Sequence, residues 1–459
     1  MIMTPHVNSR PVAAHFLTLG AALLLAFGGR SAIAQAPLVL TLGGAARLAA
    51  DKSAGPEVAR LRVDQAEARV RQSRAAFLPI VSGAVSESER TFNSASFGIS
   101  FADPLTGKSL FDPNDQVLGP VKIYDVRGTV RQNIYDPSAF ARLKAAHASA
   151  SAFGDEAAAQ SQQAAAVAAA VYVRALRADA QLAARAADST LAEDLLGIAR
   201  DQLSAGVGIA LDVTRAQSQL AATRAQLIAA RNERNRARLD LHRALGLPLS
   251  APIALADSLP GLPASSALPS EQEATDRAMK SRADLRAADG QIAAAERQIE
   301  SIKSERMPSL SAFIDQGPTG KGPSNLLSTY DWGVQLSVPI FDGFRREGRL
   351  EEQKAAVQEL GVRRRDLTEQ AAIDVSGALL DLVSAREELA ATGEHLRFAE
   401  QELSQARDRF RSGVSGNADV ITASLGLNAA RTQVVDSRAA FQSARVALAR
   451  AQGTVTELP

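Results

Sequence analysis

Two carboxylates, Asp212 and Asp419, stand at matching places in a stretch that occurs twice in the chain. In both copies an Ala-Arg-Asp triplet leads to a Gly-Val pair, and the aspartate follows the glycine by six residues. Glycine before a β-branched residue ends a helix. A carboxylate stabilises the positive end of the helix that begins next. We therefore expect each aspartate in the first turn of a helix that follows a sharp turn.

Other side chains capable of chemistry form no catalytic pattern. His147, His242 and His395 are scattered along expected helices, without a partner at metal-ligand spacing. The chain has no cysteine, which excludes thiol catalysis, disulfides and an acylated N-terminal cysteine. We therefore expect no enzyme activity, no cofactor and no bound metal.

Two further motifs also have plain structural explanations. Residues 317–322 weakly resemble a phosphate-binding loop, but Asp315 stands in place of the first glycine, and Gly322 follows the lysine where Ser or Thr is needed. A turn between two strands explains them better. The triplet 363–365 is three arginines, but 51 basic against 50 acidic side chains leave a formal charge of +1. We expect a solvated helix face and no nucleic-acid binding.

The repeated stretch belongs to a tandem duplication. Identical residues recur at an offset of 207 positions, among them Arg224 with Arg431 and Gly246 with Gly453, and farther upstream the offset is 229. Each copy contains a long helical hairpin. The expected tips are Gly206-Val207-Gly208 in the first copy and Gly413-Val414-Ser415 in the second.

The helix after each tip carries two heptad seams. In the second copy one seam is large (Val420, Leu427, Val434, Phe441, Leu448) and the other is small (Ala423, Ala430, Ser437, Ala444, Ala451). Two seams let a helix contact two neighbours, as a curved wall of helices requires. An ordinary coiled coil has the same heptads, so the pattern alone leaves both architectures open. The helix before each tip, at about 68 residues and 1.5 Å each, would reach ~100 Å.

The N-terminal segment has the layout of a secretory signal. A polar start precedes an apolar run from Val12 to Phe27, and Ala32-Ile33-Ala34 suits cleavage after Ala34. A transmembrane helix is the alternative, but the run is short and ends in small residues. No later stretch is apolar over the ~20 residues of a spanning helix, so insertion into a membrane would require a barrel.

Two segments change from helical periodicity to strict alternation. From Tyr330 to Ile340, apolar side chains alternate with Asp331, Gly333, Gln335, Ser337 and Pro339. Similar alternation around Tyr124 to Ile134 predicts one hairpin in each copy and four long strands in all. Trp332, with Tyr330 two places before it, suits an interfacial aromatic girdle, although a soluble half-buried sheet would alternate too. A closed barrel needs about eight strands and one chain supplies four, so a closed barrel must be formed by several copies of the chain.

These elements give the expected domains. We expect a signal peptide over 1–34, a first repeat over 35–250, a proline-rich linker over 251–270 and a second repeat over 271–459. After an initial helix from Thr41 to Leu78, the first repeat has a β-hairpin over 80–134, a long helix over 138–205 and a helix over 209–246. The second has a β-hairpin over 309–340, a long helix over 343–412 and a helix over 416–452.

The order and duplication of these motifs resemble the TolC family of outer membrane efflux and secretion channels. The aromatic-Asp pairs Tyr135-Asp136 and Phe341-Asp342, the helix-ending prolines Pro79 and Pro308, and the Gly-Val tips all resemble family features. The resemblance implies a mainly α protein with transmembrane β-strands: a homotrimer with a periplasmic α-barrel and a twelve-stranded β-barrel in the lipid of the outer membrane. Strand counting alone leaves the number of copies open.

The resemblance also implies partners and sites. The tips would dock onto a periplasmic adaptor protein that works with an inner-membrane transporter, in a tripartite efflux pump or a type I secretion system. Asp419 matches the first acidic position of the family's periplasmic entrance, Thr422 replaces the second acid, and Asp212 is the equivalent in the first copy. Helix capping explains the same glycines and aspartates without docking or gating. A non-conducting periplasmic adaptor or scaffold is the alternative function.

Overall fold

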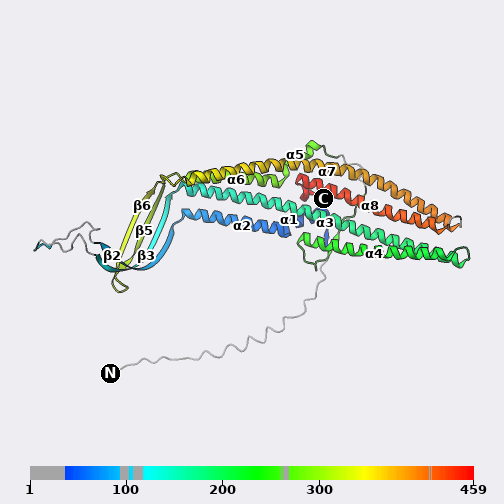
Figure 1. The fold of residues 1–459 in the computed structure, drawn as a ribbon, viewed down its shortest axis with the longest axis horizontal. Helices are drawn as coiled ribbons and strands as arrows, with labels where there is room; N and C mark the ends of the chain where they lie inside the picture. The colour runs from blue at the N-terminus through cyan, green and yellow to red at the C-terminus, as the bar shows by residue number, and fades with distance from the viewer. Residues whose placement is uncertain are drawn as a thin grey trace, which may run out of the picture.

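In the computed structural model the molecule is elongated, with strands at one end and the turns of two helical hairpins at the other (Figure 1). The structure describes residues 37–93, 103–106, 117–259, 261, 268–412, 414 and 416–459. The expected signal peptide lies outside the described residues, as do Gly413 and Ser415 of the second tip.

The helices and strands follow the internal repeat. The first half contains β1 (Leu38–Leu40), α1 (Leu42–Lys52), α2 (Ala54–Arg74), the short 3₁₀ helix η1 (Ala75–Phe77), β2 (Ile80–Asn93), β3 (Val117–Tyr135), α3 (Pro137–Ser204) and α4 (Ala210–Leu245). The second half contains β4 (Ile253–Leu255), α5 (Glu271–Ser281), α6 (Ala283–Ser304), β5 (Ser309–Gly320), β6 (Leu326–Ser337), α7 (Arg345–Arg411), α8 (Asn417–Gln452) and the 3₁₀ helix η3 (Val455–Glu457). The alternation that we expected to continue to Ile340 stops at Ser337.

The sequence predicted one unbroken helix from Thr41 to Leu78, and this was wrong. The helix is divided at Ser53 into α1 and α2, and the second half repeats the division at Arg282, between α5 and α6. Pro56 has no N–H to donate to the carbonyl oxygen of Lys52, which disfavours a continuous helix through Ser53. At both divisions a glycine from the end of another helix also lies close. Gly246 has φ 67° and a Cβ there would lie 2.7 Å from the carbonyl oxygen of Lys52, while Gly453 has φ 72° and a Cβ would lie 2.9 Å from Cα of Arg282.

The matching aspartates that precede the long helices differ in role. The carboxylate of Asp136 caps α3 by accepting a hydrogen bond from the backbone N–H of Ala139 over 3.0 Å. Asp342 instead binds the buried Arg346 side chain over 2.7 Å. Between Asp342 and α7 the chain passes through Phe344, which has φ 63°. One sequence motif therefore begins two helices in two ways.

Four strands form an antiparallel sheet in the order β2-β3-β5-β6. The register places apolar side chains on one face: Val81, Val85, Tyr124, Val126, Val130, Leu310, Ile314, Tyr330, Trp332, Val334 and Leu336. The other face is mainly polar: Ser82, Ser86, Asp125, Arg127, Thr129, Arg131, Asp315, Thr329, Asp331, Gln335 and Ser337. Residues 317–320 lie in β5, so the weak phosphate-loop motif is strand and turn.

A second, small sheet was missed from the sequence. β1 and β4 pair in parallel, with Val39 opposite Ala254. β4 lies inside the segment that was expected to be only a linker. The hydroxyl of the buried Tyr172 on α3 donates to the carbonyl oxygen of Leu40 over 2.6 Å and lies 3.1 Å from the Asp257 carboxylate. Burial raises the pKa of Tyr172 well above its ordinary value. This sheet is therefore anchored to the middle of the long helix.

Both heptad seams of α8 are buried. Every member of the large seam and of the small seam lies in the core, because α8 packs against α7 and also against α3. On α4 the matching seams are only partly buried, since α4 packs mainly against α3. Among the described residues, no helix contains a window apolar enough to cross a membrane.

We expect Gly246→Ala and Gly453→Ala each to lower the free energy of unfolding by about 1 kcal/mol or more, because a Cβ meets backbone atoms and φ is positive. Thermal unfolding followed by circular dichroism measures the effect. The control is Gly393→Ala on α7, where nothing lies within 4 Å of an added Cβ and the first repeat already carries Ala186. Equal losses in all three variants would contradict the close-approach explanation.

Candidate functional site

The first hairpin tip is a tight turn built on two glycines. Gly206 has φ 75°, and the backbone N–H groups of Val207 and Gly208 both donate to the carbonyl oxygen of Gln202. A Cβ at Gly208 would lie 3.0 Å from Cβ of Gln202. The turn leaves the Val207 side chain 79% exposed at the end of the hairpin.

The second tip is described at Val414, whose side chain is 70% exposed and whose N–H donates to the carbonyl oxygen of Arg409 over 2.9 Å. Two side chains join the tips. The amide of Gln202 donates to the carbonyl oxygen of Phe410 over 3.1 Å, and the buried Asn417 donates to the carbonyl oxygen of Asp212 over 2.9 Å. The two hairpin ends therefore form one surface.

The two matching aspartates both lie in the first turn of a helix, as expected, but their surroundings differ. Asp212 is half-buried and lies 3.8 Å from the guanidinium of Arg215. Asp419 is exposed, with no ion-pair partner among the described residues. Thr422 is also exposed, and its hydroxyl donates to the carbonyl oxygen of Ala418 over 2.9 Å. Asp419 is therefore the more accessible of the two carboxylates.

A buried carboxylate farther from the tips was missed from the sequence. The side chain of Asp188 on α3 is 1% exposed and binds Arg431 of α8 over 3.0 Å and Arg185 over 3.4 Å. With its amide nitrogen turned toward Asp188, Asn428 donates a further hydrogen bond over 2.8 Å. Burial raises the pKa of the Asp188 carboxyl above its ordinary value, and the two guanidinium groups offset only part of this effect.

A second polar contact joins the same two helices. Asp436 of α8 accepts hydrogen bonds from Arg177 over 2.8 Å and from Gln181 over 3.0 Å, both on α3. One signal for this seam was present in the sequence, since Arg431 belongs to the identities between the repeats. Asp188, the partner of Arg431, gave no such signal, because the matching position in the second copy is His395.

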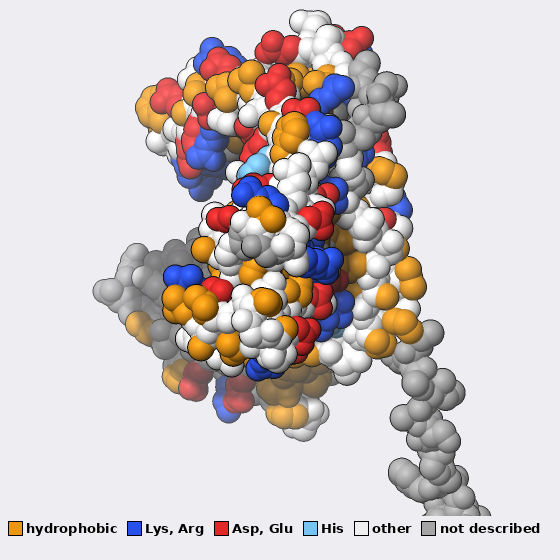
Figure 2. Space-filling model, turned by 90° about the vertical axis from the view of Figure 1, so that its right-hand side faces the viewer, with side chains coloured by type: hydrophobic (Ala, Val, Ile, Leu, Met, Phe, Trp, Pro, Cys, Tyr) orange, Lys and Arg blue, Asp and Glu red, His pale blue; other side chains and the backbone are white. Residues whose placement is uncertain are grey.

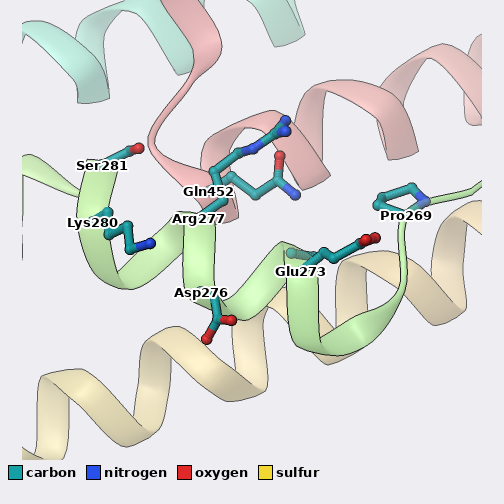
Figure 3. Close-up of a pocket in the computed structure, with 8 residues that line it drawn as sticks. Pro269, Glu273, Asp276, Arg277, Lys280, Ser281 and Gln452 are labelled. Carbon is teal, nitrogen blue, oxygen red and sulfur yellow. The ribbon is translucent and has the colours of Figure 1, made fainter.

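Other features do not assemble a reactive centre. A cavity of about 530 Å³ lies between α5 and the end of α8, lined by Pro269, Glu273, Asp276, Arg277, Lys280 and Gln452. Its side chains diverge, since Arg277 points toward Gln452 and Asp276 to the opposite side of α5 (Figure 3).

The described residues contain no group of His, Cys, Asp or Glu that could hold a metal. His395 instead contacts Gln433, over 3.1 Å. Seen from the hairpin ends, basic and acidic side chains are interspersed (Figure 2).

The comparisons with known proteins agree with this geometry. A family model described as outer membrane efflux protein matches residues 57–247 and 274–454. Protein CyaE of Bordetella pertussis is 27% identical over 279 residues; the match covers 58% of this chain and 57% of that protein. The chain thus matches little more than half the length of this curated relative.

Two solved structures have the same fold. The Campylobacter jejuni CmeC outer membrane channel gives a TM-score of 0.72 at 15% identity, over 90% of this chain and 85% of that chain. The outer membrane protein VceC from Vibrio cholerae gives a TM-score of 0.68 at 19% identity, over 90% of this chain and 96% of that chain. Together with the family model, they confirm the fold class expected from the sequence and the family resemblance.

We expect Asp188→Ala to lower the free energy of unfolding by about 2–3 kcal/mol, because it leaves two guanidinium groups without their shared carboxylate; both keep some contact with water, which limits the loss. Denaturant unfolding measures the effect. Adding Arg431→Met should recover part of the loss, and no recovery in the double variant would contradict a direct ion pair.

The same residue predicts a pH dependence. The folded state raises the pKa of Asp188 above its ordinary value near 3.8, so the folded chain binds this proton more tightly than the unfolded chain. The stability of the natural protein relative to Asp188→Asn should therefore rise as the pH falls through the raised folded value toward 3.8. Asp381→Asn, at an exposed position of α7, controls for removing one carboxylate. A difference that shrinks on acidification would show that the two guanidinium groups lower the pKa of Asp188 more than burial raises it.

Proposed function

Because the chain belongs to the outer membrane efflux protein family, we propose that it is the outer membrane channel of a tripartite efflux pump or a type I secretion system. It lies in the outer membrane and extends into the periplasm. In this proposal it passively conducts substrate, delivered by an inner-membrane transporter and a periplasmic adaptor, to the exterior.

The observation that carries the proposal is the two-faced sheet. One face carries most of the apolar side chains, including Trp332 and Tyr330, together with the charged Glu87, Glu89 and Lys122. The opposite face carries Asp125, Arg127 and Asp331. Such a sheet suits lipid on one side and water on the other. A scaffold or adaptor hairpin has no need of a lipid-facing surface, which favours the channel over the alternative.

The open edges of the sheet support an assembly of copies. Within the described residues β2 and β6 each have a neighbour on one side only. Edge strands in lipid leave backbone groups unpaired, so β6 of one copy is expected to pair with β2 of the next. Three copies would close twelve strands, the number that the TolC resemblance implies.

The hairpin tips are the proposed docking surface for the adaptor. Val207 and Val414 are exposed at the ends, and Ile209 and Leu211 beside the first tip are 57% and 50% exposed. Gly206 and Gly208 allow a partner backbone to approach closely. Gly413 and Ser415, which also belong to this proposal, lie outside the described residues.

Asp419 is the proposed acidic element of the periplasmic entrance. In a closed ring of copies its exposed carboxylate recurs around the axis, where converging charges attract cations. Thr422 supplies no second charge one turn later. Asp212 has the weaker claim, because it is half-buried beside Arg215.

Single-channel recordings of the detergent-purified oligomer in a planar bilayer test the function. We expect stable, cation-preferring openings, and a roughly two- to threefold lower cation-over-anion permeability ratio in Asp419→Ala, because a ring of charge is lost. Asp212→Ala should have a smaller effect, and Asp276→Ala, on α5, serves as the remote control.

The outcomes separate the parts of the proposal. Openings indifferent to Asp419→Ala would leave the channel standing and remove the acidic entrance. An absence of openings from a verified, folded oligomer would favour the non-conducting scaffold.

A further inference from the structure

The cavity between α5 and the end of α8 is lined by hydrogen-bond donors that have no acceptor. Arg277 and Gln452 extend toward each other from the two helices (Figure 3). Gln452 is only 5% exposed, yet among the residues that the structure describes its amide has no hydrogen-bond partner. The side chains of Arg277, Lys280 and Ser281 likewise form no hydrogen bond or ion pair within the described chain. All four groups can therefore donate to a molecule that enters the cavity.

The two carboxylates that line the cavity already accept hydrogen bonds elsewhere. Glu273 accepts from the backbone N–H of Ser270 over 3.1 Å, and this bond, with a smaller contribution from Arg277, lowers the pKa of the Glu273 carboxyl. Asp276 accepts from Gln272 over 3.0 Å and points to the opposite side of α5 (Figure 3). Positive charge and free donors are thus gathered toward the end of α5, away from Glu273 in its first turn.

The first repeat fills the same place with apolar side chains. At the offsets of 229 for α5 and 207 for α8, three lining residues have leucine counterparts: Leu40 for Pro269, Leu48 for Arg277 and Leu245 for Gln452. Leu40 and Leu245 are 5% and 0% exposed in a hydrophobic core, and Leu48 packs against that core. The fold therefore does not require polar side chains here, and the second repeat has them in addition to what the fold needs.

The chemistry of the free donors selects an anion with planar oxygens. A guanidinium group donates two parallel hydrogen bonds to a carboxylate, and the amide nitrogen of glutamine supplies a further donor. The volume of about 530 Å³ is in the range of small-molecule pockets. The apolar surfaces of Pro269 and Ala274 also line it and can contact a carbon skeleton.

We propose that this cavity binds an organic carboxylate, with Arg277 and Gln452 on its oxygens, Lys280 adding positive charge and Ser281 a further donor. A free dicarboxylic acid and the acidic side chain of a peptide both present this group. The site lies in the helical part of the molecule, away from the sheet and from the hairpin tips (Figure 1). It goes beyond the proposed channel, and its test does not require conduction.

Isothermal titration calorimetry of the detergent-purified oligomer tests the site. The probes are glutarate, its uncharged diamide glutaramide, inorganic phosphate and the capped dipeptide acetyl-Glu-Glu-amide, all at constant ionic strength because salt screens exposed charges. We expect glutarate to bind about tenfold more tightly than glutaramide, because only the acid forms charge-assisted hydrogen bonds, and more tightly than phosphate. The tighter of glutarate and the dipeptide identifies the source of the carboxylate, and binding of either supports the site.

Two variants replace a lining residue with its counterpart from the first repeat. We expect Arg277→Leu to weaken glutarate binding about tenfold, because a charge-assisted pair is lost, and Gln452→Leu to weaken it about threefold. The matched control is Arg286→Leu on α6, which also removes an exposed positive charge but does not line the cavity. It should change the affinity by less than about twofold.

The outcomes separate this site from the proposed function. Equal weakening in Arg286→Leu and Arg277→Leu would reduce the binding to general attraction of anions and overturn the site. Tighter binding of phosphate than of glutarate would overturn the assignment to a carboxylate. Conducting oligomers that bind none of the probes would refute the site and leave the channel, whereas specific binding by oligomers without openings would support the site and refute the channel.

Discussion

The close packing of one helix, α3, against neighbours from both repeats is the constraint on which the molecule depends. α3 contacts α1, α2 and α4 of its own repeat and α6 and α8 of the other, and many of its core positions are small: Ala165, Ala166, Ala168, Ala169, Ala175 and Ala178 are all buried. Alanine combines high helix propensity with little volume, which allows a helix of 68 residues to stay regular while others lie close around it. Larger side chains at these positions would push the two repeats apart.

Much of the fold could be predicted because it is written in periodicities. The offset of 207 residues located both hairpins, and the alternation around Trp332 located the second β-hairpin. What failed depends on contacts between distant segments. Gly246 lies against the break at Ser53, and the strand after the first repeat pairs with β1. A single sequence carries no periodic signal for either contact.

The sequence predicted the place of the two aspartates in the first turn of their helices, but not their surroundings. Asp212 and Asp419 share a motif, yet only the structure separates a half-buried carboxylate beside Arg215 from an exposed one. Asp188 could not be found by comparing the repeats, because the second copy has His395 there. In the first copy this charged side chain lies where α3 meets α8 of the second half of the chain.

The pairing of Asp188 with Arg431 has a consequence for symmetry. In a ring of three copies, each with two repeats, six equivalent units would be expected. Only the contact between the two repeats of one chain, however, contains the buried ion pair of Asp188 with Arg431. Boundaries of two strengths would then alternate around the wall. If the proposed ring of three copies forms, we expect each whole chain to move as one unit, so that any widening of the wall follows the copies and not the repeats.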